Sequence, residues 1–132
     1  MATLTQEMKD LVAQQQCFVA TVNADGTPTV GPKHSTHVFD DEHLVFSEAT
    51  GNRTWANVQR GSKVAIAVVD HDSMKGFRFE GRAKAITSGT AFDKAADMLK
   101  QHGIMTELKA VVKVRVERVF NLGMPGAGEE IL

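Results

Sequence analysis

The sequence predicts a mainly β domain of the α+β class, in which six antiparallel strands close or partly close into a barrel. Residues 110–120 alternate apolar and polar side chains, which is typical of a strand with one buried face. Asp25-Gly26 lies between two strand-like runs and is a strong hairpin signal. Strand and helix patterns do not alternate as they do in βαβ units, which argues against a Rossmann domain. A chain of 132 residues fits a single domain over residues 1–132.

The first element is a predicted helix over residues 3–16. Its apolar residues fall on one stripe at helical spacing. Thr3 with Gln6 has the spacing of a capping box, so we expect the helix to begin there.

Six strands follow, at residues 17–23, 27–38, 44–47, 63–70, 76–87 and 110–120. Pro28 and Pro32 cannot donate backbone hydrogen bonds, so the second strand is expected to lie at an edge or to bulge near them. The continuous apolar run 64–69 predicts a strand buried on both faces. Gly81 predicts a bulge or bend in the fifth strand.

Two further helices interrupt the strands. Asn52 is a good N-cap for a helix over residues 53–60, which Gly61 would end. Thr90 is expected to cap a second helix that Gly103 would end.

Composition narrows the classes of function. The net charge of −1 and the interspersed charges favour neither nucleic acid nor a membrane surface as a partner. Cys17 is the sole cysteine, and the polar N-terminus lacks the apolar core of a signal peptide, so we expect a cytoplasmic protein. The histidines lack metal-ligand spacing, and no metal site is expected.

The start of the predicted helix at residue 53 is the most informative segment. Amide groups at a helix start carry the positive end of the dipole and hold phosphate well. Arg53 adds a guanidinium and Thr54 a hydroxyl donor. The alternative is a plain capped helix with a solvated arginine.

The strand around Gly31 and Lys33 is the second candidate. Gly31 would let a flat ligand approach the backbone, and Lys33 could place a cation beside a ring that becomes anionic on reduction. The alternative is an edge strand protected by proline and lysine, which is a common device.

Together these segments resemble the pyridoxamine 5′-phosphate oxidase-like FMN-binding split barrels. The resemblance covers roughly residues 10–120. It rests on the order and spacing of four pieces: the hairpin 18–28, Gly31-Pro32-Lys33, the Asn52-Arg53-Thr54…Asn57 helix followed by 63–66, and the strand 76–83.

The resemblance implies a six-stranded antiparallel split β-barrel with flanking short helices that binds FMN at the interface of a homodimer. The phosphate would lie at Asn52, Arg53 and Thr54, and the ring along 30–35 and 46–47, with Asn57 contacting the cofactor or bracing the loop. The implied cofactor-binding set is Val30, Gly31, Pro32, Lys33, His34, Ser35, Phe46, Ser47, Asn52, Arg53, Thr54 and Asn57. The partner subunit would complete the site, and a nicotinamide or another donor would supply electrons.

Two departures matter. The tail 123–132 lacks the Arg and His that hold pyridoxal phosphate in the true oxidase, and Thr54 stands where the family often has Lys. We therefore expect an FMN-dependent oxidoreductase other than that oxidase, with no catalytic acid or base identified. The alternatives are a flavin carrier or sensor without turnover, or a split barrel that binds a deazaflavin or haem.

Overall fold

Seven antiparallel strands form one sheet in the computed structural model, which describes residues 2–104 and 106–132. The elements are α1 (Gln6–Gln14), β1 (Cys17–Val22), β2 (Pro28–Pro32), β3 (His37–Asp40), β4 (His43–Glu48), α2 (Arg53–Gln59), β5 (Lys63–Asp70), β6 (Lys75–Ile86), α3 (Thr90–Gln101) and β7 (Ala110–Asn121). The predicted mainly β class is confirmed, with seven strands instead of six.

The extra strand arises because the predicted strand 27–38 divides into β2 and β3. Pro32 has no amide hydrogen to continue a ladder. A turn follows at once, since the amide and the hydroxyl of Thr36 both donate to the Lys33 carbonyl, at 3.1 and 2.8 Å. The sequence pattern missed this turn because no glycine or Asn-Gly pair marks it.

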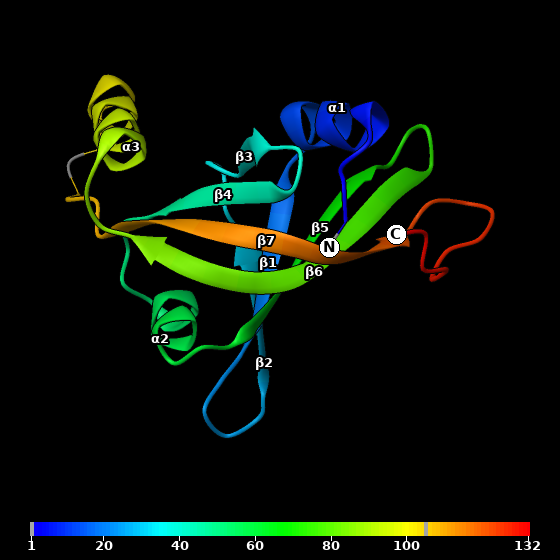
Figure 1. Cartoon of the computed structure of the whole chain (residues 1–132), viewed down its shortest axis with the longest axis horizontal. Coiled ribbons are helices and arrows are strands. Elements are labelled where there is room, and N and C mark those ends of the chain that lie inside the picture. The colour runs from blue at the N-terminus through cyan, green and yellow to red at the C-terminus, as the bar shows by residue number, and fades with distance from the viewer. Residues whose placement is uncertain (1, 105) are drawn as a thin grey trace.

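The sheet curls into a split barrel because its two edge strands are neighbours in the chain. The strand order is β2-β1-β5-β6-β7-β4-β3, so β2 and β3 lie at opposite ends of the sheet. Only residues 33–36 join them, a span of at most about 18 Å for an extended chain. In Figure 1, β1 and β2 cross steeply behind β4, β6 and β7.

The barrel interior is the main core. It is filled by fully buried side chains from several strands and from α1, which lies over one end (Figure 1). The largest of these side chains are Phe46, Phe79, Met8, Leu44 and Ile66. The helix α1 begins later than expected, because Thr5, not Thr3, forms the capping box, with Met8.

The start of α2 agrees with the sequence prediction, and the start of α3 does not. Asn52 caps α2 as predicted, with its side chain accepting from the Thr54 amide. Thr90 is the first residue of α3 and does not cap it; Gly89 occupies the cap position without a side-chain bond. The described residues contain no helix long and apolar enough to cross a membrane.

Strand β5 corrects one expectation that bears on function. Its side chains Val64, Ile66 and Val68 are buried, but Val69 is 48% exposed and Ala65 and Ala67 are only partly covered. The prediction of a strand buried on both faces was wrong for this chain alone. An uninterrupted apolar run does not reveal what covers its second face.

Candidate functional site

A buried carboxylate ties together the segments that the sequence singled out. Glu48, the last residue of β4, is fully buried, and its Oε1 accepts from Lys33 Nζ at 2.8 Å. Its Oε2 accepts from the amides of Thr50 and Gly51 and from the Thr50 hydroxyl, each at 3.1 Å. The end of β2 and the turn before α2 are therefore joined through one side chain.

The ionised form of Glu48 is favoured despite its position. Burial opposes ionisation, but the hydrogen bond and charge of Lys33 and the bonds from Gly51 and Thr50 outweigh it, and the pKa of the carboxyl lies below its usual range. Lys33 is thus a cation whose charge is compensated within the protein. The sequence reasoning missed Glu48, since a carboxylate at a strand end normally faces water.

A second contact joins the segments near the same strand. The Ser47 amide donates to Ser35 Oγ at 2.8 Å, which links β4 to the turn that follows β2. His34 lies on the exposed side of that turn, where its Nδ1 is 2.6 Å from Gln16 Oε1. The structure therefore places Lys33, Ser35 and Ser47 on the same side of this turn as Glu48, whereas His34 is exposed.

The start of α2 presents uncommitted donors. The Arg53 side chain is exposed and forms no ion pair among the described residues. In the first helical turn the amides of Arg53 and Trp55 have no acceptor within the helix, whereas that of Thr54 is capped by Asn52. Thr54 itself is buried. The turn and helix start over residues 49–54, called the corner below, can accept an anion through the Arg53 side chain and the free amides.

A second cation lies beside this corner. Gly51 has a φ of +68°, and a Cβ built there would lie 2.7 Å from Cε and 3.6 Å from Nζ of Lys109. The Lys109 side chain thus lies across the turn, brought from the start of β7. Sequence reasoning did not identify Lys109, because it lies 58 residues away from Gly51 in the chain.

Asn57 has a structural task in this chain. Its Nδ2 donates to Thr21 Oγ1 and Asn23 Oδ1, both at 2.9 Å, and its Oδ1 accepts from Arg60. The side chain is buried and its polar atoms are bonded within the protein. Asn57 braces α2 against β1, which fits the bracing part of the prediction.

The remaining predicted residues divide between surface and core. Val30 is 68% exposed on β2, Pro32 is also exposed, and a Cβ at Gly31 would meet nothing within 4 Å. This edge is open to a flat ligand. Phe46 is fully buried in the core.

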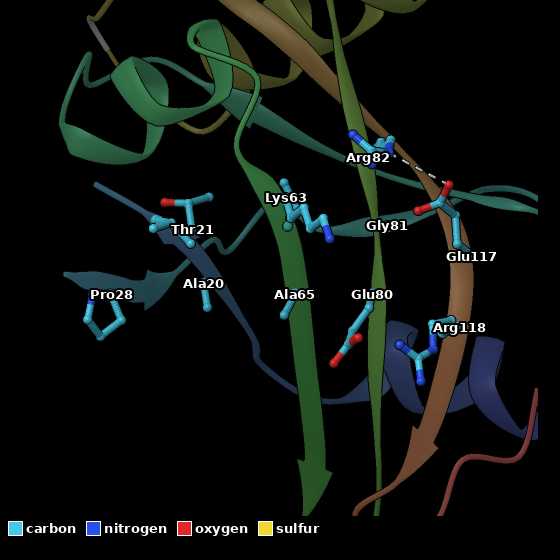
Figure 2. Close-up of a pocket in the computed structure, with 12 residues that line it drawn as sticks. Ala20, Thr21, Pro28, Lys63, Ala65, Glu80, Gly81, Arg82, Glu117 and Arg118 are labelled. Carbon is cyan, nitrogen blue, oxygen red and sulfur yellow. Dashed lines mark ion pairs between the residues drawn. The ribbon is translucent and has the colours of Figure 1, made fainter. Parts of the chain in front are cut away.

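A hollow lies elsewhere, on the outer face of β1, β5, β6 and β7 (Figure 2). It has a volume of about 350 Å³, and Lys63, Glu80 and Arg118 are among its lining residues. Arg82 and Glu117 form an ion pair at 3.9 Å at its side (Figure 2). None of the residues predicted to bind a cofactor lines this hollow.

Comparison with known proteins gives consistent matches over nearly the whole chain. A family model described as pyridoxamine 5′-phosphate oxidase matches residues 4–123. The crystal structure of HupZ from Group A Streptococcus is 41% identical, with a TM-score of 0.82 over 95% of this chain and 98% of that one. A putative pyridoxamine 5′-phosphate oxidase from Lactobacillus delbrueckii is 35% identical, with a TM-score of 0.75 over 89% and 93%.

More distant structures share the fold alone. An FMN-binding protein from Syntrophomonas wolfei is 14% identical, with a TM-score of 0.72 over 89% of this chain and 84% of that one. An F420 reductase is 23% identical, with a TM-score of 0.66 over 88% and 98%.

Proposed function

This chain belongs to the pyridoxamine 5′-phosphate oxidase-like family, and from that premise we propose that it is an FMN-binding flavoprotein and an oxidoreductase. The observation that carries the proposal is the corner at the end of β4, where Arg53 has no ion-pair partner among the described residues and Lys109 lies across the turn. Two cations beside free amides suit a phosphate dianion.

The residues fit the cofactor in two parts. Arg53 and Asn52 would hold the phosphate, and the open edge from Val30 to the turn at Ser35 would take the isoalloxazine ring. Bound FMN would supply the electron-transfer chemistry, while the protein would orient the ring and set its electrostatic surroundings. Lys33 would tune the ring less than a free lysine, because Glu48 balances its charge.

The proposal does not extend to oxidation of pyridoxamine 5′-phosphate. The tail 123–132 has no Arg or His, and residues 129–132 pair with β7 through Asn121 and Val119 instead of reaching the corner. We propose a nicotinamide or another small donor as the electron source and a cytoplasmic location, which the single buried Cys17 suits.

We expect purified protein to carry or take up FMN stoichiometrically and to show the visible absorption of a bound flavin. Absorption spectroscopy with mass spectrometry of the released ligand checks this. A released deazaflavin would favour the second candidate, which the likeness to an F420 reductase supports. A haem spectrum, or a protein that binds no flavin, would contradict the proposal. Turnover with a nicotinamide donor and an acceptor would separate an enzyme from a carrier.

We also propose that the chain is a homodimer whose second copy completes the site. The outer face of β1, β2 and β5 carries apolar side chains that this chain leaves uncovered. Phe18, Val22 and Val69 are 45%, 44% and 48% exposed, and Val30 is 68% exposed. Their strands are paired in register, so these side chains form one continuous patch around Ala20 and Ala65.

Charged groups border this apolar patch on one side, on β6 and β7. Arg78 and Glu80 of β6 pair at 2.8 Å, and Arg118 of β7 pairs with Glu130 at 2.8 Å. An apolar centre with a charged rim is the usual composition of a protein–protein interface. The second copy would also cover the outer face of β5, which the sequence led us to expect to be buried.

Sedimentation at micromolar concentration should give about twice the 14.3 kDa chain mass. Phe18→Asp places a charge in the centre of the patch and should raise the dimer dissociation constant about 30- to 700-fold, the effect of losing a hot-spot contact. Met98→Asp is the matched control, because Met98 is 53% exposed on α3, away from the patch. A wild-type monomer that binds FMN tightly would contradict the shared site.

A further inference from the structure

The buried Glu48 has a role that the proposed function does not yet assign. We propose that Glu48 is a positioning residue that holds the ring side and the phosphate side of the FMN site in fixed relation. Its carboxylate binds Lys33, at the end of β2, and the Thr50–Gly51 turn that leads into α2. This inference rests on the proposed function, since it concerns the geometry of the same site.

The burial of Glu48 is the first argument. It is fully buried at the end of a strand whose neighbours Val45 and Phe46 are core residues. A carboxylate is costly in such surroundings unless it is paired and hydrogen-bonded. An apolar residue would fill the same place in the barrel, but it could not hydrogen-bond both Lys33 and the turn.

The division of its hydrogen bonds is the second argument. Oε1 accepts a hydrogen bond from Lys33, and Oε2 accepts hydrogen bonds from Thr50 and Gly51 of the turn. A glutamine has one acceptor oxygen and one donor amide. In Glu48→Gln the single oxygen can accept from either Lys33 or the turn. The amide group then faces the donors of the other segment and cannot accept from them. The conservative variant therefore breaks one of the two links while keeping the shape.

The electrostatic consequence is the third argument. The Lys33 side chain is only 11% exposed, and its Nζ lies 5.7 Å from the centre of the Phe46 ring, so water screens it weakly. In the native pair the Glu48 charge balances the Lys33 charge. Removing the Glu48 charge leaves a cation beside the proposed ring position, which favours reduced, anionic FMN over oxidised FMN.

The test compares Glu48→Gln and Lys33→Gln with the control Asp41→Asn. The control removes a carboxylate from another lysine pair, the exposed contact between Lys9 and Asp41. NMR of the protein without flavin follows the amide signals of Thr50 and Gly51. Titrations then give the dissociation constants of oxidised and reduced FMN, the latter from the midpoint potential.

Glu48→Gln should shift the amide signals of Thr50 and Gly51, because these amides either lose their acceptor or donate to a neutral amide oxygen instead of a carboxylate. It should also weaken oxidised FMN about tenfold and raise the preference for reduced FMN about tenfold. Lys33→Gln should leave the turn amides near their native positions and lower that preference, because Glu48 keeps its turn bonds. A purely structural role would not give these opposite changes in potential. If Glu48→Gln does not fold, Lys33→Gln still tests the proposal. In that variant the amide signals of Thr50 and Gly51 should stay near their native positions, and the preference for reduced FMN should fall.

The inference is overturned if Glu48→Gln moves the turn amides and the FMN constants no more than Asp41→Asn does. It is also overturned if both glutamine variants shift the potential in the same direction. A wild-type chain that binds no FMN refutes the proposed function instead. In that case the amide signals still decide whether Glu48 holds the turn.

Discussion

Arg53→Ala is expected to weaken FMN binding about 10- to 150-fold and to leave riboflavin binding nearly unchanged. Arg53 is exposed, and in the proposed site its guanidinium would form charge-assisted hydrogen bonds to the phosphate. Each such bond contributes roughly 1.5–3 kcal/mol, and the fold-change follows from that range. Riboflavin lacks the phosphate. Flavin fluorescence titrations of the variant with both ligands measure the two effects.

The control for Arg53 is Gln59→Ala, at the far, exposed end of α2. This variant should change the dissociation constant of neither FMN nor riboflavin. The stability of Arg53→Ala should stay near that of the native chain, because an exposed side chain without an ion pair contributes little to folding. Equal weakening of FMN and riboflavin would show that the phosphate is not held at this corner.

Gly81→Ala is expected to destabilise the fold by more than about 4 kcal/mol. A Cβ at Gly81 would lie 1.8 Å from the carbonyl oxygen of Arg115 and 2.8 Å from its carbonyl carbon. Both atoms are backbone, so no side chain can move to make room. The clash falls at the bulge where the register between β6 and β7 shifts, after Glu80. Denaturant unfolding measures the loss.

Gly31→Ala is the matched control for this prediction. Gly31 is also a strand glycine, but a Cβ there would meet nothing within 4 Å. The denaturant midpoint for unfolding of Gly31→Ala should stay close to that of the native chain. If Gly81→Ala unfolds at the native denaturant concentration, the close approach of β6 and β7 described above does not exist.

Much of the element order follows from local patterns. The bounds of β5 agree with the sequence prediction, and β7 extends it by one residue. Asn52 caps α2 and Gly81 marks the bulge, both as expected, because capping and bulging depend on a few neighbouring atoms. The split of residues 27–38 was missed, since its turn depends on Thr36 and the Lys33 carbonyl, without a turn-specific residue.

The candidate site was predicted in part. Residue chemistry and the family resemblance identified Arg53 and Lys33 as candidate cofactor-binding residues. It could not show that Lys33 is paired with Glu48, or that Asn57 is fully bonded to Thr21, Asn23 and Arg60. Apart from Arg60, those partners are 15 to 36 residues away along the chain, and hydrogen-bond pairing over such separations has no local signature.

Local periodicity and residue chemistry placed most of the strands and the short helix after Asn52, because these depend on side chains close together in the chain. The resemblance of four sequence segments indicated the family. Only the tertiary structure decided which charges are compensated and which faces are covered. The curl of the sheet brings Lys33 to Glu48 and Lys109 to Gly51, and it leaves one face of β5 bare. These are long-range outcomes, because charge pairing and burial depend on which distant segments the closed barrel places side by side.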